Sequence, residues 1–362
     1  MKIDQIHFYV NNASHWRDWF ISQMGFNRVA SGNSDPNTVL EVVKSGEAEF
    51  LLYAADNEKS PVAEYLKHHP SGVAAITFAM TELEEHFPNL LSAEVTVLQP
   101  LQTLKTDTGC LKWCQVRGMT GLIHTLVERQ GETPLLPSLP QWIAKPSTLP
   151  GKYFTGIDHL VLNVAQGELT PTVEWYKHTF GWQAKQAFSI TTARSGLHSQ
   201  VLVSPRGEVQ FPINEPSSEN SQIQEFLNFN HGAGIQHLAL STPDVTEVTL
   251  QLKALGVPFL RVPETYYNQL RERLHQFPFS AREWEKIQQA QVLVDCEAEA
   301  VSSLTSNRSR TPLLLQIFTQ PIFSEPTFFF ELIERRDRAQ GFGEGNFRAL
   351  FAAIEREQQA RG

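Results

Sequence analysis

The sequence of 362 residues contains only three cysteines, Cys110, Cys114 and Cys296, an odd number spread widely along the chain. Such a set does not make a disulfide framework, and the paired C-x-x-C motifs of structural zinc sites are absent from the sequence. We therefore expect free thiols, a reducing compartment and no zinc site.

Long apolar runs and excess positive charge are also lacking. No run approaches the roughly 18 residues of a membrane-spanning helix, and the opening MKIDQIHFYV has none of the features of a signal peptide. The 30 Lys and Arg are outnumbered by 39 Asp and Glu, whereas nucleic-acid binding depends on clustered Lys and Arg. The sequence predicts a cytoplasmic protein that binds small molecules, not nucleic acid or membrane, and is compatible with a homo-oligomer.

One segment, residues 130–152, carries five prolines and interrupts the regular patterns on both sides. It reads as an interdomain linker. The chain is long enough for two domains with cores of their own. We therefore predict a first domain over 1–129 and a second over 153–362.

The two predicted domains repeat each other. Three segments of the first recur in the same order in the second, namely IDQIHFYV (3–10) as IDHLVLNV (157–164), GVAAITFAM (72–80) as GIQHLALST (234–242) and LIHTLVER (122–129) as FFFELIER (328–335). Internal repeats of this kind determine the architecture.

Within each half, an opening strand is followed by a helical pattern and then by several strands. Residues 169–182 place Val173, Tyr176 and Phe180 on one helical face before Gly181. Strand-like runs follow at 185–194, 199–204 and 208–213, and a second helical pattern occupies 243–259. We predict an α+β fold of four βαβββ modules, paired into two open barrels that each enclose a cavity.

Aligning the halves sets potential metal ligands of the second half against different residues of the first: His159 against Gln5, His237 against Ala75, and Glu331 against Thr125. Period-two alternation on strands can point all three ligands into the cavity. A single strand histidine is often a hydrogen-bonded core residue, but a carboxylate among phenylalanines must be paired, protonated or metal-bound. Two imidazoles and one carboxylate form the ligand set of non-haem Fe(II) oxygenases.

From about Tyr153 onward, the chain resembles the catalytic domain of the 4-hydroxyphenylpyruvate dioxygenases, of the vicinal-oxygen-chelate (glyoxalase-like) superfamily. The resemblance is carried by IDHLVLNV, FPINEPSSENSQIQEFL (211–227), GAGIQHLAL (232–240), PETYYNQL (263–270), LLLQIF (313–318), FFFELIER and GFGEGNFRALFAAIEREQ (341–358). The first half is similar to the family only in outline, as a metal-free domain of the same fold.

The resemblance implies that His159, His237 and Glu331 bind one Fe(II) per chain. It implies polar residues that orient the substrate, Ser199, Asn214, Gln222, Gln236 and Gln316, and apolar walls, Phe318, Phe329, Phe342, Phe347 and Leu350. Ordinary strand and turn hydrogen bonding remains an alternative for Asn214 and Gln222, and a plain core function for Phe318 and Phe329.

The implied reaction converts 4-hydroxyphenylpyruvate and dioxygen to homogentisate and carbon dioxide by oxidative decarboxylation, ring hydroxylation and side-chain migration. The alternatives are a 4-hydroxymandelate synthase, an extradiol catechol dioxygenase, or a metal-free binding protein of the superfamily. The phenylalanine at position 347 is the residue type of the dioxygenases, whereas the mandelate synthases have a smaller aliphatic residue at this position, so the resemblance favours the dioxygenases.

The C-terminal stretch places Phe347, Leu350, Phe351 and Ile354 on one apolar stripe. This pattern predicts a helix that either gates the cavity or simply packs against it. The preceding GFGEGNF reads as a hinge, and residues 302–312 form a polar insertion.

Overall fold

The structure is a computed structural model and describes residues 1–92, 95–135, 153–191, 195–273, 279–296, 312–343, 345–346 and 349. The strands of the first half are β1 (Lys2–Tyr9), β2 (Asn27–Asp35), β3 (Thr38–Ser45), β4 (Ala48–Ala55), β5 (Gly72–Ala79), β6 (Thr96–Lys105), β7 (Gly109–Arg117) and β8 (Ile123–Gly131). Those of the second half are β9 (Gly156–Asn163), β10 (Gln183–Thr191), β11 (Gly196–Val203), β12 (Gln210–Pro216), β13 (Gly234–Ser241), β14 (Leu293–Cys296), β15 (Leu313–Phe318) and β16 (Phe329–Arg336).

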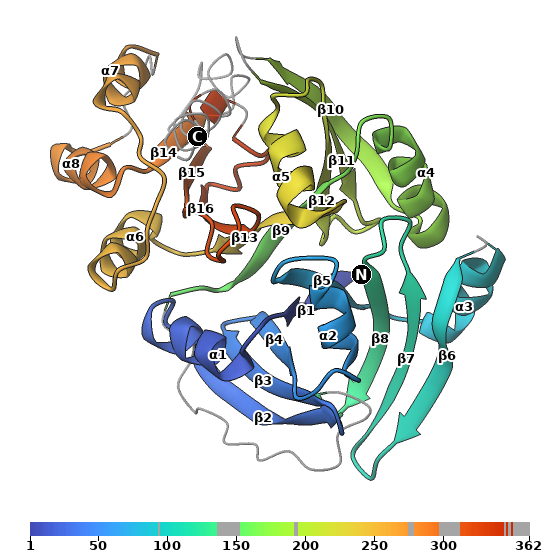
Figure 1. Ribbon diagram of the computed structural model, residues 1–362. Coiled ribbons are helices and arrows are strands. Elements are labelled where there is room, and N and C mark those ends of the chain that lie inside the picture. Colours follow the sequence, from blue (N-terminus) through green and yellow to red (C-terminus); the bar gives the residue numbers. More distant parts are fainter. Residues whose placement is uncertain are drawn as a thin grey trace.

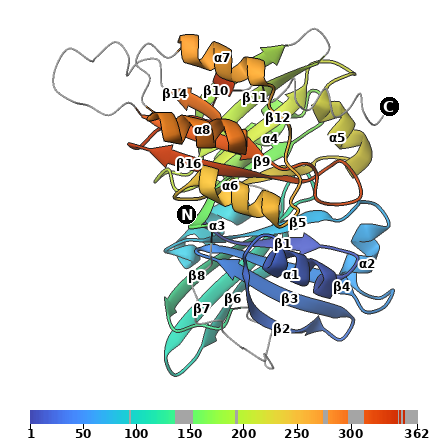
Figure 2. The same cartoon turned by 90° about the vertical axis from the view of Figure 1, so that its left-hand side faces the viewer.

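Each half forms one eight-stranded mixed sheet. The first has the strand order β2-β3-β4-β1-β5-β8-β7-β6, and the second repeats it as β10-β11-β12-β9-β13-β16-β15-β14. The two curved sheets lie one above the other, with the first half below the second in Figures 1 and 2. The predicted α+β fold of paired βαβββ modules is confirmed.

The helices are α1 (Ala13–Ser22), α2 (Pro61–Leu66), α3 (Leu83–Ser92), α4 (Leu169–Phe180), α5 (Gln222–Asn230), α6 (Val245–Ala254), α7 (Glu264–Arg273) and α8 (Ala281–Ala290). Of these, α1, α3, α4 and α6 are the helices of the four modules. Helix α4 ends at the predicted Gly181, whose φ of 66° is left-handed and suits glycine. Helices α7 and α8, which extend the last module along the outside of the second half (Figure 2), were not predicted.

The strand register confirms the alignment of the two halves. In the second sheet Ala239 lies opposite His159 on one side and Glu331 on the other. In the first sheet Thr77 lies in the same way between Gln5 and Thr125. The repeat therefore extends to individual residues at the centre of each sheet.

The segment FFFELIER divides its side chains between two environments. Phe328 and Phe330 pack against the first half, with ring centroids 5.2 Å from Phe8 and 5.9 Å from Phe50, respectively. Phe329 and Glu331 lie on the other face of β16, because strand side chains alternate. One continuous hydrophobic cluster thus includes residues of both halves.

No helix within the described ranges combines the length and apolar character needed to cross a membrane. Of the predicted linker, residues 136–152 lie outside the part of the chain that the structure describes, as do residues 302–311 of the polar insertion. Strand β8 extends to Gly131, so its last two residues lie in the predicted linker.

A second contact between the halves involves a buried histidine. His124 Nε2 on β8 and the Tyr176 hydroxyl on α4 share a hydrogen bond of 3.0 Å. Burial lowers the pKa of His124 to about 3, so this imidazole is neutral in the folded protein at neutral pH.

We predict that His124 makes the protein less stable in mild acid. Its folded-state pKa lies below the unfolded value of about 6.5, so the unfolded state binds more protons between these values. The free energy of unfolding should fall as pH drops from 6.5 toward 4, by up to about 1.4 kcal/mol per pH unit from this residue. Urea unfolding at several pH values should show a shallower dependence for His124→Gln than for the wild type, and equal slopes would contradict the prediction.

Candidate metal centre

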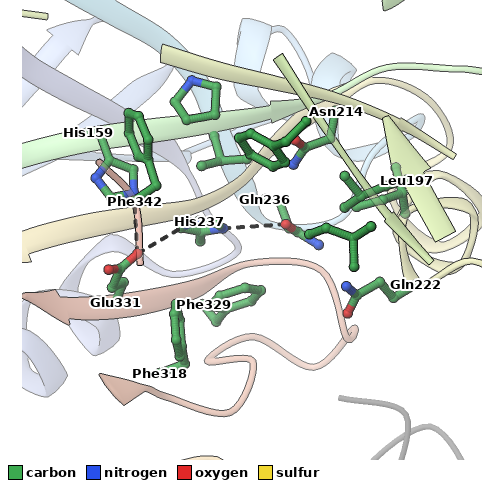
Figure 3. A pocket seen from close by; sticks show the side chains of 15 residues that line it. His159, Leu197, Asn214, Gln222, Gln236, His237, Phe318, Phe329, Glu331 and Phe342 are labelled. Carbon is green, nitrogen blue, oxygen red and sulfur yellow. Dashed lines mark hydrogen bonds and ion pairs between the residues drawn. The ribbon is translucent and has the colours of Figure 1, made fainter. Parts of the chain in front are cut away.

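Three neighbouring strands bring His159 (β9), His237 (β13) and Glu331 (β16) together in the second half (Figure 3). Glu331 Oε2 lies 3.2 Å from His159 Nε2 and 3.6 Å from His237 Nε2. All three residues are buried. Among the residues described, they are the one group of three or more His, Cys, Asp or Glu side chains arranged closely enough to hold a metal ion.

The geometry and chemistry of this group fit a divalent transition metal. Two ligands at right angles, each about 2.1 Å from a metal, lie about 3 Å apart, close to both distances observed here. The second carboxylate oxygen, Glu331 Oε1, is buried without a hydrogen-bond partner. Imidazole and carboxylate donors together suit iron of the non-haem type.

The two histidines differ in their electrostatics. Burial alone would lower the pKa of His159, but the carboxylates of Glu331 and Asp158 outweigh it and raise the pKa to about 9. Burial, together with the neighbouring His159, lowers the pKa of His237. Without a metal, the site therefore holds one imidazolium–carboxylate pair beside a neutral imidazole.

Each histidine has an acceptor behind it that fixes its orientation. His159 Nδ1 donates to Asp158 Oδ1 at 2.9 Å, and His237 Nδ1 donates to Gln236 Oε1 at 3.4 Å. Both Nε2 atoms are consequently directed at Glu331. Such partners commonly set the tautomer and ring angle of metal-binding histidines.

The cluster lies in the wall of a pocket that opens to the surface of the second half. Six predicted substrate residues line it: Asn214, Gln222, Gln236, Phe318, Phe329 and Phe342. The rest of the lining is apolar, so the polar groups of the pocket are the three amides and the metal cluster itself (Figure 3).

Four other predicted residues are not among those lining this pocket. Ser199 lies in register between the lining residues Phe188 and Asn214, so it is on the same face of the sheet. Gln316 is buried next to Gly343, with both amide atoms lacking a hydrogen-bond partner. Phe347 and Leu350 fall outside the described residues, as does most of the predicted C-terminal helix.

The pocket also contains apolar residues that the sequence interpretation missed: Val161, Phe188, Ile190, Leu197, Pro212 and Ile223. Several could have been found from strand alternation. Val161 follows His159 by two positions, Leu197 precedes Ser199 by two, and Pro212 precedes Asn214 by two.

The equivalent positions of the first half are occupied by a hydrogen-bonded polar cluster. Gln5 Nε2 donates to Glu49 Oε1 at 2.7 Å, and Gln115 Nε2 donates to Thr125 Oγ1 at 3.1 Å. Gln5, Ala75 and Thr125 replace the two imidazoles and the carboxylate there, so this part of the first half lacks the ligand set of the second.

Comparison with known proteins agrees with this site. Residues 156–280 match the model of the glyoxalase/bleomycin resistance protein/dioxygenase superfamily. The chain is 33% identical to 4-hydroxyphenylpyruvate dioxygenase of Yarrowia lipolytica, covering 99% of this chain and 92% of that protein. The 4-hydroxyphenylpyruvate dioxygenase of Legionella pneumophila is 34% identical, with 94% and 90% covered.

The chain belongs to the 4-hydroxyphenylpyruvate dioxygenase family. This membership makes it an enzyme, and confirms the resemblance expected from the sequence. An uncharacterized protein of Synechocystis is 36% identical over 98% of this chain. Among solved structures, a mutant 4-hydroxymandelate synthase from Streptomyces coelicolor has a TM-score of 0.84 at 26% identity, with 99% of this chain and 98% of that chain covered.

We predict that a divalent metal stabilises the protein through this cluster. Adding Co²⁺ to metal-stripped protein should raise Tm, because a ligand that binds only the native state stabilises it, by about 2.7 kcal/mol at a hundredfold excess over Kd. Glu331→Ala should abolish the increase. Thr125→Ala, at the equivalent position of the first half, should retain it. A calorimetric scan that showed the same increase in Glu331→Ala would remove this residue from the site.

Proposed function

We propose that this protein binds one Fe(II) per chain through His159, His237 and Glu331 and converts 4-hydroxyphenylpyruvate and dioxygen to homogentisate and carbon dioxide. The observation that carries the proposal is the convergence of two imidazoles and one carboxylate at the wall of an aromatic pocket. Family membership supplies the substrate.

Iron in this position would supply the redox chemistry that activates dioxygen toward the 2-oxo acid. The protein's part begins with three ligands from adjacent strands, which leave about three coordination positions facing the pocket. The rigid sheet holds these ligands in place. The 2-oxo and carboxylate oxygens of the substrate suit two of the open positions.

The far end of the pocket offers polar groups for the phenol of the substrate. Asn214 and Gln222 lie across the pocket from Glu331 in Figure 3. Gln222 Oε1 is buried without a partner and can accept a hydrogen bond from the phenol hydroxyl. An unpaired buried acceptor of this kind favours a ligand that satisfies it.

The rings between these two ends position the substrate ring and exclude water. Phe329 is stacked on His237, with ring centroids 4.8 Å apart, and Phe342 meets the His159 ring edge-on at 5.2 Å. Phe318 lies 6.2 Å from Phe329. An aromatic wall against both histidines keeps bulk water from the reacting atoms and limits side reactions.

The proposal extends to the organisation and location of the chain. We propose that residues 1–129 form a metal-free domain, 130–152 a linker and 153–362 the catalytic domain, which the division of the strands between two sheets supports. We also propose a cytoplasmic location, which is based on the sequence. Dioxygen and 4-hydroxyphenylpyruvate are the proposed partners, without nucleic acid or membrane.

A second candidate function is 4-hydroxymandelate synthesis, because a mutant of such a synthase shares the fold at a TM-score of 0.84. The dioxygenase assignment is favoured because dioxygenase relatives reach 33 and 34% identity, against 26% for that synthase. The two activities differ in the carbon that is hydroxylated, so product analysis separates them.

We predict that the iron-loaded enzyme yields mainly homogentisate from 4-hydroxyphenylpyruvate in air. Chromatography of the reaction mixture, together with carbon dioxide release, tests this result. Mainly 4-hydroxymandelate would assign the chain to the rival activity, and no product from iron-loaded protein would refute both.

Replacing the unpaired amide should weaken substrate binding. We predict that Gln222→Leu raises KM for 4-hydroxyphenylpyruvate about tenfold, the effect of losing one hydrogen bond of about 1.4 kcal/mol. Gln224→Leu is the matched control, because Gln224 lies on the same helix and bonds the exposed Asn228. Steady-state kinetics that gave both variants the same KM would contradict a contact between Gln222 and the substrate.

A further inference from the structure

Four residues after Glu331, Arg335 joins two parts of the second half. Its Nε and Nη2 atoms donate to Asp158 Oδ2 and Oδ1, both at 2.7 Å. Its Nη1 donates to the backbone carbonyls of Ala339 at 3.2 Å and Gly341 at 2.9 Å. One guanidinium therefore bonds a buried carboxylate and the chain that leaves β16.

The carboxylate side of this network leads to the metal centre. Asp158 accepts from His159 Nδ1 through Oδ1, the same oxygen that accepts from Arg335 Nη2. Burial would raise the pKa of Asp158, but the hydrogen bonds from Arg335 and His159 outweigh it and lower the pKa. The carboxylate is thus a charged bridge between the arginine and the histidine.

The two backbone carbonyls bonded by Arg335 belong to a segment that lines the pocket through Phe342. After β16, Asp337 and Arg338 adopt left-handed φ values of 50° and 61°, which turn the chain back. The returning segment 339–343 places the Phe342 ring over His159. Gly343 follows so close to the Gln316 amide that a Cβ atom there would lie 2.2 Å from its Oε1. We call residues 339–343 the cover segment.

The first half contains the same anchor without the metal ligands. Arg129 bonds Asp4 Oδ2 through Nε and Nη2 at 3.3 and 3.2 Å, and the Pro134 and Leu135 carbonyls at 2.8 and 2.9 Å. Leu135 packs against a cluster of buried apolar residues in that sheet. The arginine–aspartate pair is therefore a feature of the repeated fold that fastens the exiting chain.

What differs is the residue after the aspartate. In the second half it is His159, which bonds the aspartate directly. In the first half it is Gln5, whose amide instead donates to Glu49 and, at 3.5 Å, to the Leu135 carbonyl. In the second half, therefore, the arginine–aspartate pair is hydrogen-bonded to a proposed metal ligand.

We propose that Arg335 is a positioning residue that couples the placement of the cover segment to the orientation of His159, and hence to metal binding. The proposal rests on His159 being a metal ligand. When the cover segment is in place, its two carbonyls hold the guanidinium against Asp158, and Asp158 holds the imidazole. Coupling between two sites is reciprocal, so a metal bound at His159 should in turn order the cover segment.

Lysine cannot replace this arginine. The guanidinium presents planar donors that meet both carboxylate oxygens and two carbonyls at once, whereas an ammonium group is a single charge with three donors on a flexible stem. Arg335→Lys consequently keeps the charge and removes the geometry. Arg129→Lys does the same in the first half, where no metal ligand is attached, and serves as the matched control.

The test measures Co²⁺ affinity by chelator competition and backbone hydrogen–deuterium exchange over 339–343, with and without Co²⁺. Both arginine variants should lose a similar amount of thermal stability. Arg335→Lys alone should weaken Co²⁺ binding by about ten- to a hundredfold, the effect usual for partners behind a metal ligand. In the wild type and Arg129→Lys, Co²⁺ should slow exchange in the cover segment, and in Arg335→Lys it should not.

Asp158→Asn provides a second test, because it keeps the side-chain size but removes the bridging charge. It should reproduce both the weaker Co²⁺ binding and the loss of metal-dependent protection. If Arg335→Lys does not fold, the Asp158→Asn variant tests the proposed coupling in its place.

Two results would overturn the proposal. One is unchanged Co²⁺ affinity in Arg335→Lys and Asp158→Asn. The other is weaker affinity while Co²⁺ still protects the cover segment, which would make Arg335 a support for His159 without coupling. Failure of the metal site is distinguishable, since wild-type protein would then bind no Co²⁺ at all. Failure of the proposed reaction would instead appear in the product analysis and leave the Co²⁺ results unchanged.

Discussion

The second half is organised around one constraint, the burial of the Glu331 carboxylate. A lone charge among phenylalanines is several kcal/mol unfavourable, and two imidazole nitrogens within 3.2 and 3.6 Å offset this cost here. Those partners come from the next two strands on one side of β16 in the sheet, β13 and then β9. The first half has the neutral Thr125 at this position and needs no such partners.

The sequence alone predicts this arrangement well, because it depends on periodicity and on comparison of the two halves. Aligned repeats identify positions without knowledge of distances, and the register of β9, β13 and β16 places His159 and Glu331 opposite Ala239 as the alignment requires. The fold follows from the same patterns.

Other features depend on contacts that no local pattern specifies. The Arg335–Asp158 pair joins residues 177 positions apart, and the bonds of Arg335 to the Ala339 and Gly341 carbonyls come after the left-handed turn at Asp337 and Arg338. Helices α7 and α8 interrupt the last module, so the βαβββ pattern does not predict them. Gln316 is buried against Gly343 and does not line the pocket beside the metal centre, because the chain after β16 folds back over it.

The shared packing of Phe328 and Phe330 against Phe8 and Phe50 makes the two repeated halves depend on each other. The residues at the sheet centres can differ, and the first half has Gln5 and Thr125 where the second has His159 and Glu331. The apolar surfaces at this contact cannot change in the same way, because a second half on its own would present an exposed phenylalanine face and tend to aggregate. The first half therefore keeps the second half soluble as well as folded, and a second half produced alone would need another cover for that face.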